Sequence, residues 1–225
     1  MAKLQIALDC NDSDTALQVL EEVYPYVDIA ELGTPLMVAE GAAGIRRLRK
    51  EYPALTLLAD IKLMDGGGPI ASIAFEAGAD IVTVLGVASD LTIRGVAEAA
   101  EKYGKKSFVD LICAKDPEKR AMQIDGIGAD YIGVHTSYDL REEKSAPLED
   151  LKKLKACVKN AEISISGGIR LEMLDSILEA EPDIIVTGSS IMNSMDRRGT
   201  AKALYEKIHE MDNKGFSERS EGKYE

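Results

Sequence analysis

Cysteine is scarce in this 225-residue chain, and the scarcity limits the kinds of protein it can be. The three cysteines, Cys10, Cys113 and Cys157, are odd in number and far apart, which argues against a disulfide framework and against a zinc site. Cys10 and Cys113 lie near predicted strand ends, and small buried side chains are the simpler interpretation of both. The cysteine pattern therefore predicts a protein of the reducing cytoplasm.

Basic residues are outnumbered, with 27 Lys and Arg against 39 Asp and Glu and a net charge of −12. This balance argues against nucleic acid or an anionic membrane as a partner, because both need a basic face. No apolar run reaches the length of a membrane span. The chain enters its first predicted strand near residue 4 without a signal-peptide pattern. We therefore expect a globular protein that binds neither nucleic acid nor a membrane.

A short apolar segment followed by a helical pattern recurs eight times along the chain. The predicted strands are 4–8, 27–32, 56–59, 80–85, 107–112, 130–134, 162–166 and 183–187. The predicted helices are 13–24, 42–52, 70–77, 91–103, 118–127, 148–159, 171–179 and 201–211. Alternation favours a parallel sheet, and eight units favour an α/β fold closed into a (β/α)8 TIM barrel, with an open doubly wound sheet as the alternative. We predict a single barrel domain over residues 1–211 and a polar, disordered tail over 212–225.

Charged residues crowd the end of the third predicted strand. Asp60 and Lys62 are two residues apart, so on an extended strand their side chains point to the same side. Asp65 follows, and the three glycines behind it let the backbone turn or approach a ligand closely. Such charges are costly to desolvate unless they are paired or hold a ligand. A structural ion pair is the alternative, but the added Asp65 and glycines favour a functional site.

Other polar residues lie at the ends of other strands, and in a barrel these ends meet at one mouth, where active sites lie. The residues collected there are Asp9, Glu31, Asp60, Lys62, Asp110 and His135. Glu31 and Asp60 come from adjacent strands, and two carboxylates suit Mg²⁺ (or Mn²⁺), which fills its remaining positions with water and substrate. An ion pair between Glu31 and Lys62 is the alternative. We assign Asp9 and Asp110 to substrate binding.

His135 is one of only two histidines, and it is the one at a strand end. Because imidazole titrates near neutrality, His135 is the first candidate for proton transfer, with a supporting or core histidine as the alternative. Lys62, flanked by Asp60 and Asp65, is expected to stay protonated and to stabilise negative charge. A Schiff base is not expected, because the flanking carboxylates oppose the low pKa that a nucleophilic lysine needs. We expect catalysis to rest on Asp60, Lys62, Asp65 and His135.

Glycines and hydroxyls, rather than charges, follow the last two predicted strands. Backbone N–H groups of such loops bind phosphate, and barrels often place a phosphate site after strands seven and eight. Simple tight turns are the alternative. The predicted phosphate-binding residues are Ser166, Gly167, Gly168, Gly188 and Ser189.

Together these segments are familiar as a set, in this order along the chain: Leu8-Asp9, Glu31-Leu-Gly-Thr-Pro35, Leu-Ala-Asp60-Ile-Lys62-Leu-Met-Asp65, Val-Thr-Val-Leu-Gly86, His135-Thr-Ser-Tyr-Asp139 and Ser-Gly-Gly168. Over about residues 3–210 the chain resembles the 3-hexulose-6-phosphate synthase family of the orotidine-5′-phosphate decarboxylase superfamily, whose mark is Asp-x-Lys-x-x-Asp. The resemblance implies a barrel homodimer with shared active sites, in which Asp65 reaches into the neighbour's site. It also implies Mg²⁺ near Glu31 and Asp60, and phosphate at the loops of Gly168 and Gly188.

The reaction implied is a reversible, Mg²⁺-dependent aldol addition of formaldehyde to D-ribulose 5-phosphate, through an enediolate, giving D-arabino-hex-3-ulose 6-phosphate. The related 3-keto-L-gulonate-6-phosphate decarboxylases, the main alternative, typically carry an Arg near the position of Tyr138-Asp139 and Gly-Arg where this chain has Gly188-Ser189. Both differences favour the synthase. A non-catalytic sugar-phosphate-binding barrel is an alternative of another class, since fold does not fix function.

Overall fold

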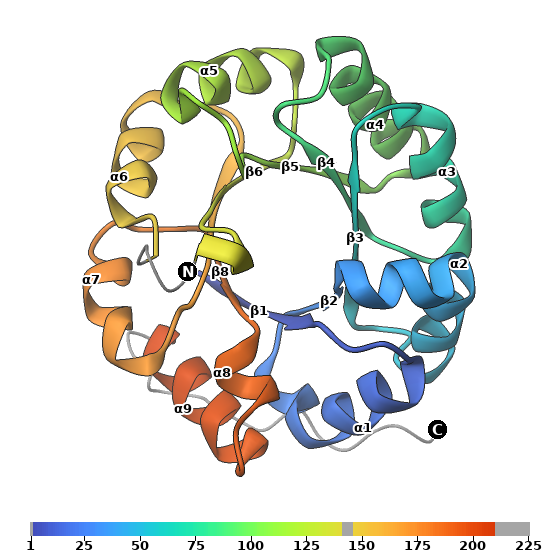
Figure 1. Ribbon diagram of the computed structural model, residues 1–225, viewed down its shortest axis with the longest axis vertical. Helices are drawn as coiled ribbons and strands as arrows, with labels where there is room; N and C mark the ends of the chain where they lie inside the picture. The colour runs from blue at the N-terminus through green and yellow to red at the C-terminus, as the bar shows by residue number, and fades with distance from the viewer. Residues whose placement is uncertain (1, 141–145, 210–225) are drawn as a thin grey trace.

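Eight parallel strands close into a ring inside a layer of helices in the computed structural model, which describes residues 2–140 and 146–209 (Figure 1). Each strand pairs with its neighbour in chain order, and β8 pairs with β1 to close the ring. The strands are β1 Lys3–Leu8, β2 Ile29–Leu32, β3 Thr56–Leu63, β4 Ile81–Leu85, β5 Lys106–Asp110, β6 Tyr131–His135, β7 Glu162–Ser166 and β8 Ile184–Thr187. The predicted (β/α)8 barrel is confirmed, and the open sheet is wrong.

Helices connect the strands and cover the outside of the ring (Figure 1). They are α1 Ser13–Val23, α2 Thr34–Glu51, α3 Gly67–Ala77, α4 Asp90–Tyr103, α5 Pro117–Ile127, α6 Leu148–Cys157, α7 Leu174–Leu178, α8 Ser189–Met192 and α9 Arg197–Ile208. Single 3₁₀ turns lie at η1 Tyr24–Tyr26, η2 Tyr138–Leu140 and η3 Leu171–Met173. Left-handed glycines end α3, α4 and α5. The tail predicted at 212–225 lies outside the described residues.

Helix α2 begins eight residues before the predicted start at residue 42. The stretch Gly33-Thr34-Pro35 suggests a loop, but proline is well suited to the first turn of a helix, where its missing N–H leaves no bond unmade. Gly41 then adopts φ 52 and interrupts the helix, so its first turns and its long second part run in different directions. The early start places Thr34 at the mouth of the barrel.

The inside of the barrel changes from apolar to polar along the strand direction. Below the carboxyl ends of the strands, the interior is filled by one small cluster of buried side chains, Ala7, Ile29, Leu58, Ile81, Phe108, Tyr131, Ile184 and Val186. The Phe108 ring lies over Gly133, where an added Cβ would come within 2.7 Å of it. Toward the carboxyl ends of the strands, the same inward positions carry Glu31, Asp60 and Asp110. The apolar layer therefore forms the floor of a polar site.

An aspartate precedes every second strand, and each one binds the strand before it. Asp28, Asp80, Asp130 and Asp183 stand just ahead of β2, β4, β6 and β8. Their carboxylates accept the backbone N–H of the preceding odd-numbered strands at 2.7–2.9 Å, the donors being Leu4, Leu57, Ser107 and Ile163 respectively. We call these four contacts the aspartate clasps. They satisfy strand N–H groups at the amino ends of the strands, on the side of the barrel opposite the mouth.

Replacing Asp80 with Ala is expected to lower the free energy of unfolding by about 2 kcal/mol, because a backbone N–H and two cations lose their partner. Lys105 Nζ lies 2.6 Å from Asp80 Oδ1, and Arg49 pairs with Oδ2. Burial alone would raise the pKa of Asp80, but the hydrogen bonds from Lys105 and Leu57 and the charge of Arg49 outweigh it and hold the pKa below its ordinary 3.8. The stabilisation is therefore complete above pH 3.8 and is lost as pH falls through the lower pKa of the folded state.

Urea titrations at neutral pH and near pH 3 test this prediction. The matched control is Asp90→Ala, which removes a carboxylate that pairs with Arg120 but is 61% exposed, and should cost less than about 1 kcal/mol. Equal losses in the two variants would show that the clasp at Asp80 adds nothing to an ordinary surface ion pair.

The cysteines and the helices bear on the expectations about compartment. All three cysteines are free, Cys10 is buried as predicted, and Cys113 is exposed, which contradicts its prediction as a buried side chain. The reason is that β5 ends at Asp110 and the loop after it turns at Cys113 with φ 62, so that the thiol faces solvent. No helix in residues 2–140 and 146–209 is long and apolar enough to cross a membrane.

Candidate active site

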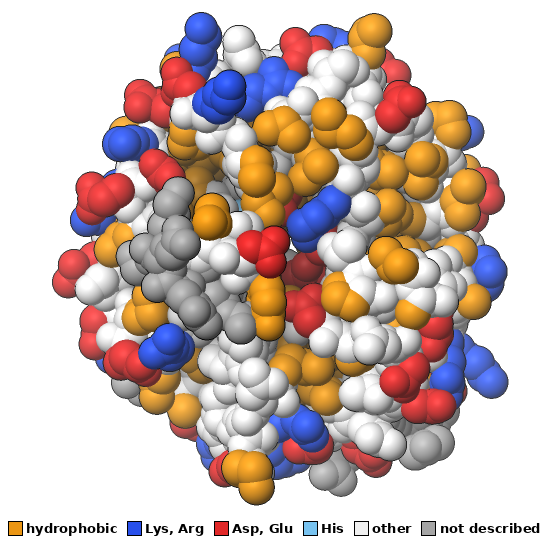
Figure 2. Space-filling view, viewed as in Figure 1, with side chains coloured by type: hydrophobic (Ala, Val, Ile, Leu, Met, Phe, Trp, Pro, Cys, Tyr) orange, Lys and Arg blue, Asp and Glu red, His pale blue; other side chains and the backbone are white. Residues whose placement is uncertain are grey.

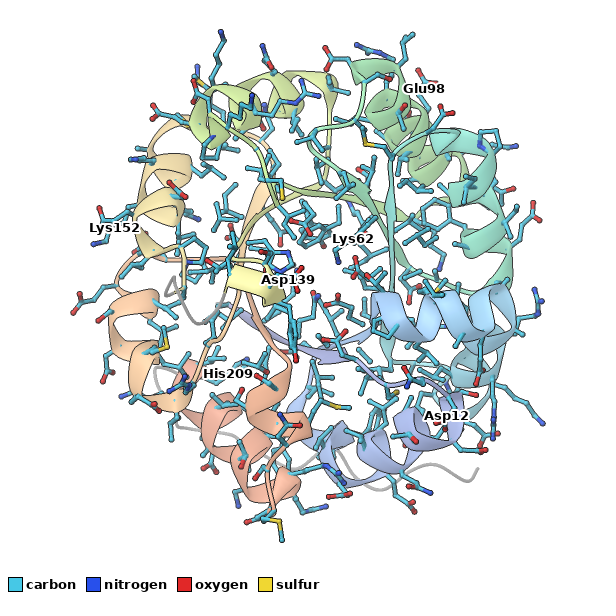
Figure 3. The ribbon with its side chains drawn as sticks, viewed as in Figure 1. Asp12, Lys62, Glu98, Asp139, Lys152 and His209 are labelled. Carbon is cyan, nitrogen blue, oxygen red and sulfur yellow. The ribbon has the colours of Figure 1, made fainter. Side chains whose placement is uncertain are left out.

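The mouth of the barrel is a hollow lined with charge. Figure 2 shows acidic side chains deep in the centre of this face, and Figure 3 shows Lys62 near the barrel axis. His209, in contrast, lies among the outer helices, away from the mouth (Figure 3). The strand-end residues predicted from the sequence are therefore gathered at one place, and His209 is not among them.

Asp60 and Lys62 form the centre of the site. The Asp60 side chain is only 5% exposed, and its Oδ2 pairs with Lys62 Nζ and accepts a hydrogen bond from the Thr34 hydroxyl at 2.6 Å. Lys62 Nζ donates to the same Thr34 oxygen at 3.1 Å. Burial alone would raise the pKa of Asp60, but the charge of Lys62 and the hydrogen bonds outweigh it and lower the pKa. Asp60 is therefore held as a carboxylate.

Lys62 is held in its charged form, as the sequence predicted. Burial favours the neutral amine, but the charge of Asp60 outweighs this and, with Asp110 and Glu31, raises the pKa of Lys62. Asp110 Oδ2 lies 4.0 Å from Lys62 Nζ. The ammonium group is thus a fixed positive charge at the bottom of the hollow, which suits it to stabilise an anion and not to act as a nucleophile.

The backbone at Lys62 departs from the extended strand that the sequence suggests. Its φ is 51, in the left-handed region, and the pairing of β3 with β4 shifts register between Ala59 and Leu63. Alternation along a regular strand is therefore not what brings the Lys62 side chain to Asp60. The two side chains meet because a bulge redirects the chain at Lys62, and the Thr83 hydroxyl on β4 accepts the Lys62 N–H there at 2.9 Å.

Asp110 and His135 form a second pair, from the neighbouring strands β5 and β6. His135 Nδ1 lies 2.9 Å from Asp110 Oδ2, and Asp110 Oδ1 accepts the backbone N–H of Ile112 at 2.9 Å. The carboxylate orients the ring and leaves Nε2 as the nitrogen that can exchange a proton with a ligand. Since Asp110 also faces Lys62, the two pairs form one continuous group.

Glu31 is on β2, beside Asp60, but it is not paired with Lys62 as one alternative proposed. Its Oε2 accepts a hydrogen bond from Gln5 Nε2 at 2.6 Å, and Gln5 is buried in the barrel interior. Burial, and then the nearby charge of Asp60, raise the pKa of Glu31 well above its ordinary value. Two carboxylates that repel each other in a confined space are an arrangement that a bound cation would relieve.

The rim beside β8 combines Asp9 with the glycine loops. The Asp9 carboxylate packs against Gly33, where an added Cβ would lie 2.2 Å from Oδ1. A Cβ at Gly188 would lie 3.6 Å from Asp9 Oδ2. The Ser190 hydroxyl donates to the carbonyl of Ile169 at 2.9 Å and ties the loop after β8 to the loop after β7. The predicted phosphate loops are thus adjacent to each other, and the loop after β8 also adjoins Asp9.

Gly167 and Gly168 shape the loop after β7, which follows Ser166 at the end of that strand. Both have positive φ, 113 and 66, and a Cβ at Gly167 would lie 2.7 Å from the carbonyl oxygen of Thr136. Only glycine fits there without strain. The Ser166 hydroxyl donates to the carbonyl of Val134 at 3.4 Å. Ser189 begins α8, the helix that Gly188 precedes.

Asp65 does not join the group of its own chain. It is exposed just beyond β3 and, within the residues described, makes no hydrogen bond or ion pair. It lies at the edge of an open groove of about 620 Å³ between α3 and α4, beside the mouth and not in it. Within the residues described, no group of three or more His, Cys, Asp or Glu side chains is arranged to bind a metal ion.

Three residues of the site were not predicted from the sequence: Gln5, Thr34 and Thr83. Gln5 breaks an apolar strand pattern, and a lone buried amide in a strand is a signal that could have indicated it. Thr34 and Thr83 are common residue types in ordinary positions, and only the fold brings their hydroxyls to Asp60 and Lys62.

Comparison with known proteins adds a family and a set of relatives. A family model described as "Orotidine 5'-phosphate decarboxylase / HUMPS family" matches residues 2–204. A protein named 3-hexulose-6-phosphate synthase from Bacillus subtilis (strain 168) is 43% identical over 206 residues, which make up 92% of this chain and 98% of that protein.

Solved structures give the same picture. The crystal structure of 3-hexulose-6-phosphate synthase from Salmonella typhimurium matches with a TM-score of 0.90 at 36% identity, over 92% of this chain and 99% of that one. The 3-keto-L-gulonate-6-phosphate decarboxylase of Vibrio cholerae O1 biovar El Tor str. N16961 matches with a TM-score of 0.82 at 28% identity, over 93% of this chain and 98% of that one. The chain is more similar to these two synthases than to this decarboxylase.

Proposed function

The chain belongs to the orotidine 5′-phosphate decarboxylase / HUMPS family, and within it we propose that it catalyses the reversible aldol addition of formaldehyde to D-ribulose 5-phosphate, giving D-arabino-hex-3-ulose 6-phosphate. The observation that carries the proposal is the higher identity to named synthases, 43% and 36%, than to the named decarboxylase, 28%. The same names support a lyase-type enzyme acting on a sugar phosphate and argue against a non-catalytic barrel.

The two pairs of side chains supply what an aldol addition needs. His135 Nε2 takes a proton from C1 of ribulose 5-phosphate, next to the ketone, while Asp110 on Nδ1 stabilises the imidazolium that forms. The electron pair left on C1 makes an enediolate, whose negative charge faces the Lys62 ammonium. C1 then attacks the carbon of formaldehyde, a C–C bond forms, and the formaldehyde oxygen takes up a proton to become the new hydroxyl.

Glu31 and Asp60 are the residues that would hold the Mg²⁺ or Mn²⁺ expected for this family. The donor set fits, because the two carboxylates come from adjacent strands, face each other at the mouth, and are hard oxygen ligands. When bound, such an ion would supply Lewis-acid stabilisation of negative charge on substrate oxygens. Gln5 fixes the Glu31 carboxylate through Oε2, and Thr34 and Thr83 fix that of Asp60.

The substrate phosphate is proposed to bind the backbone N–H groups of the loops at Gly168 and Gly188, with Asp9 beside them accepting substrate hydroxyls. Replacing Gly188 with Val should therefore raise KM for ribulose 5-phosphate by about 10-fold or more with little change in kcat, because its branched side chain fills the loop. An added Cβ at Gly188 meets no atom closer than 3.5 Å, but φ −118 and ψ −88 lie outside the favoured regions, so the free energy of unfolding of the variant is measured together with KM.

Steady-state kinetics with varied sugar phosphate test the Gly188 prediction. Gly126→Val is the matched control, because Gly126 lies on α5 with open space around its Cβ and far from the two loops in the fold. If the Gly188→Val enzyme has the same KM as the parent, the substrate phosphate does not bind at the Gly188 loop.

The protein is further proposed to be a homodimer in which each active site takes Asp65 from the other subunit. Asp65 is exposed and without a partner among the described residues, and exposed apolar side chains lie around it. Met64, Ile73 and Val38 are 56%, 56% and 82% exposed, and Figure 2 shows hydrophobic side chains gathered on the side of α3 and α4. An apolar face of this kind is typical of a subunit contact.

A cytoplasmic location, based on the three free cysteines, also stays a prediction.

Two assays with purified protein separate the candidate reactions. Ribulose 5-phosphate with formaldehyde and Mg²⁺ is expected to give a hexulose phosphate and to consume formaldehyde in equal amount. With 3-keto-gulonate 6-phosphate, release of CO₂ is expected to be much slower. Lys62→Ala serves as the inactive control. Release of CO₂ as the faster reaction would establish the decarboxylase instead.

A further inference from the structure

Thr83 occupies the point where the β3–β4 pairing is broken. Leu58 pairs with Ile81 and Ala59 with Val82, but the next pair joins Leu63 to Val84. Three residues of β3, from Asp60 to Lys62, therefore face the single residue Thr83 on β4. A bulge of this size leaves backbone groups without their usual strand partner.

The Thr83 side chain takes the place of the missing strand contacts. Its hydroxyl oxygen accepts the backbone N–H of Lys62 at 2.9 Å and donates its proton to Asp60 Oδ1 at 2.8 Å. Thr83 as a whole residue is 3% exposed, so water does not compete for these bonds. One hydroxyl thus connects the backbone of Lys62 to the carboxylate of Asp60.

The backbone that Thr83 holds is strained. Lys62 has φ 51, a conformation that a residue with a Cβ adopts only when its surroundings impose it. If Lys62 relaxed into an extended conformation, its side chain would leave along a different direction. The contact of Nζ with Asp60 and with the Thr34 hydroxyl depends on the direction that the bulge provides.

We infer that Thr83 is a positioning residue, whose hydroxyl holds Lys62 in its left-handed conformation and so aims the ammonium group at the reacting substrate. The catalytic part of this inference rests on the proposed function, in which Lys62 stabilises the enediolate. Thr83 acts on the reaction through its contacts with Lys62 and Asp60. It does not itself contact the substrate. This role requires the hydroxyl group of Thr83 but not its methyl group.

Three variants separate the hydroxyl from the rest of the side chain. Thr83→Val keeps the shape and loses the hydroxyl, Thr83→Ser keeps the hydroxyl, and Thr92→Val removes a buried hydroxyl from the following helix, where its partner is Ser89. In Thr83→Val, kcat should fall about 100-fold with KM changed by less than about 3-fold, because a small misplacement of a catalytic group costs rate. Thr83→Ser and Thr92→Val should stay within about 3-fold of the parent in both parameters.

Amide hydrogen exchange at Lys62, followed by NMR, tests the contact without any turnover. The Lys62 amide should exchange at least about 10-fold faster in Thr83→Val and at the parent rate in Thr83→Ser and Thr92→Val. Unchanged exchange in Thr83→Val would overturn the inference, and so would faster exchange with an unchanged kcat. Because exchange needs no substrate, a failure of the proposed reaction in the parent protein is distinguished from a failure of the role of Thr83.

A double-mutant cycle with Lys62→Gly guards against a general loss of folding. Glycine adopts φ near 50 without strain, so Thr83→Val should destabilise the Lys62→Gly protein less than it destabilises the parent. Equal destabilisation in the two backgrounds, measured by urea unfolding of the full chain, would show that Thr83 does not hold the backbone of Lys62.

Discussion

Two inactive variants, Asp65→Asn and Lys62→Ala, are expected to regain activity when they are mixed, unfolded and refolded together. In the proposed dimer, each site needs Lys62 from one subunit and Asp65 from the other. A mixed dimer therefore has one site with both wild-type residues and one site with neither. With random pairing about half the molecules are mixed dimers, so about a quarter of all sites should recover.

The physical reason lies in where Asp65 stands. Its carboxylate is exposed beyond β3 and has no partner among the described residues, whereas Asp60 and Lys62 are joined within one chain. The left-handed Gly66 turns the chain after Asp65, so the loop projects beside the mouth of its own barrel. In a dimer, the Asp65 loop of the second subunit can reach the mouth of the first subunit's barrel without a change in the first subunit's conformation.

A matched control uses two substitutions at residues that the same subunit contributes to each active site. Asp60→Asn mixed with Lys62→Ala should recover no activity, because every site in every mixed dimer then lacks one of the two residues. The measurement is activity after co-refolding, with mass spectrometry of the intact assemblies to count mixed dimers. Mixed dimers of Asp65→Asn and Lys62→Ala that stay inactive would show that Asp65 acts within its own subunit or not at all.

Removal of divalent metal is expected to abolish turnover. A preparation dialysed against excess chelator should lose at least about 100-fold in kcat, and added Mg²⁺ or Mn²⁺ should restore it, since Lewis-acid stabilisation of the developing charge is worth several kcal/mol. Loss of a carboxylate ligand should weaken binding of the ion, so the Glu31→Gln variant should need about 10-fold more Mg²⁺ for its half-maximal rate. Gln keeps the size of Glu31 and removes its charge.

The control for the metal experiment is a carboxylate outside the mouth. Glu98 lies on the outer helix α4 (Figure 3), and Glu98→Gln should leave the Mg²⁺ dependence unchanged. Full turnover by a metal-free preparation in excess chelator would exclude a metal-dependent reaction. A normal Mg²⁺ requirement in Glu31→Gln would exclude Glu31 as a ligand.

The gathering of Glu31, Asp60, Asp110 and His135 could be predicted because it follows from topology alone. The carboxyl ends of parallel strands meet at one edge, so the strand assignments were enough to place these residues together. The hydrogen bond between Asp110 and His135 was not predicted, although they lie on the neighbouring strands β5 and β6. Errors of a few residues in strand bounds did not matter for this result.

The fine structure around Lys62 could not be predicted, because it depends on a residue from another strand. A left-handed lysine is unfavourable locally, and its backbone N–H is bound across the bulge by the hydroxyl of Thr83. Thr34 was missed for a different reason, since the early start of α2 was concealed by Pro35 and by the interruption at Gly41. At Lys62 a tertiary contact outweighs local preference, whereas the start of α2 agrees with the preference of proline for the first turn of a helix.

The aspartate clasps bear on the order in which the ring can close. Each clasp joins residues only 20–24 positions apart, whereas the β1–β8 pairing joins Lys3 to Ile184, about 180 positions apart. The chain entropy lost on closing a loop grows with the logarithm of its length, so the β1–β8 seam costs about 2 kcal/mol more than a clasp. In terms of contact order, the barrel consists of four short-range strand pairs side by side and one long-range seam, and we expect the seam to form after the pairs.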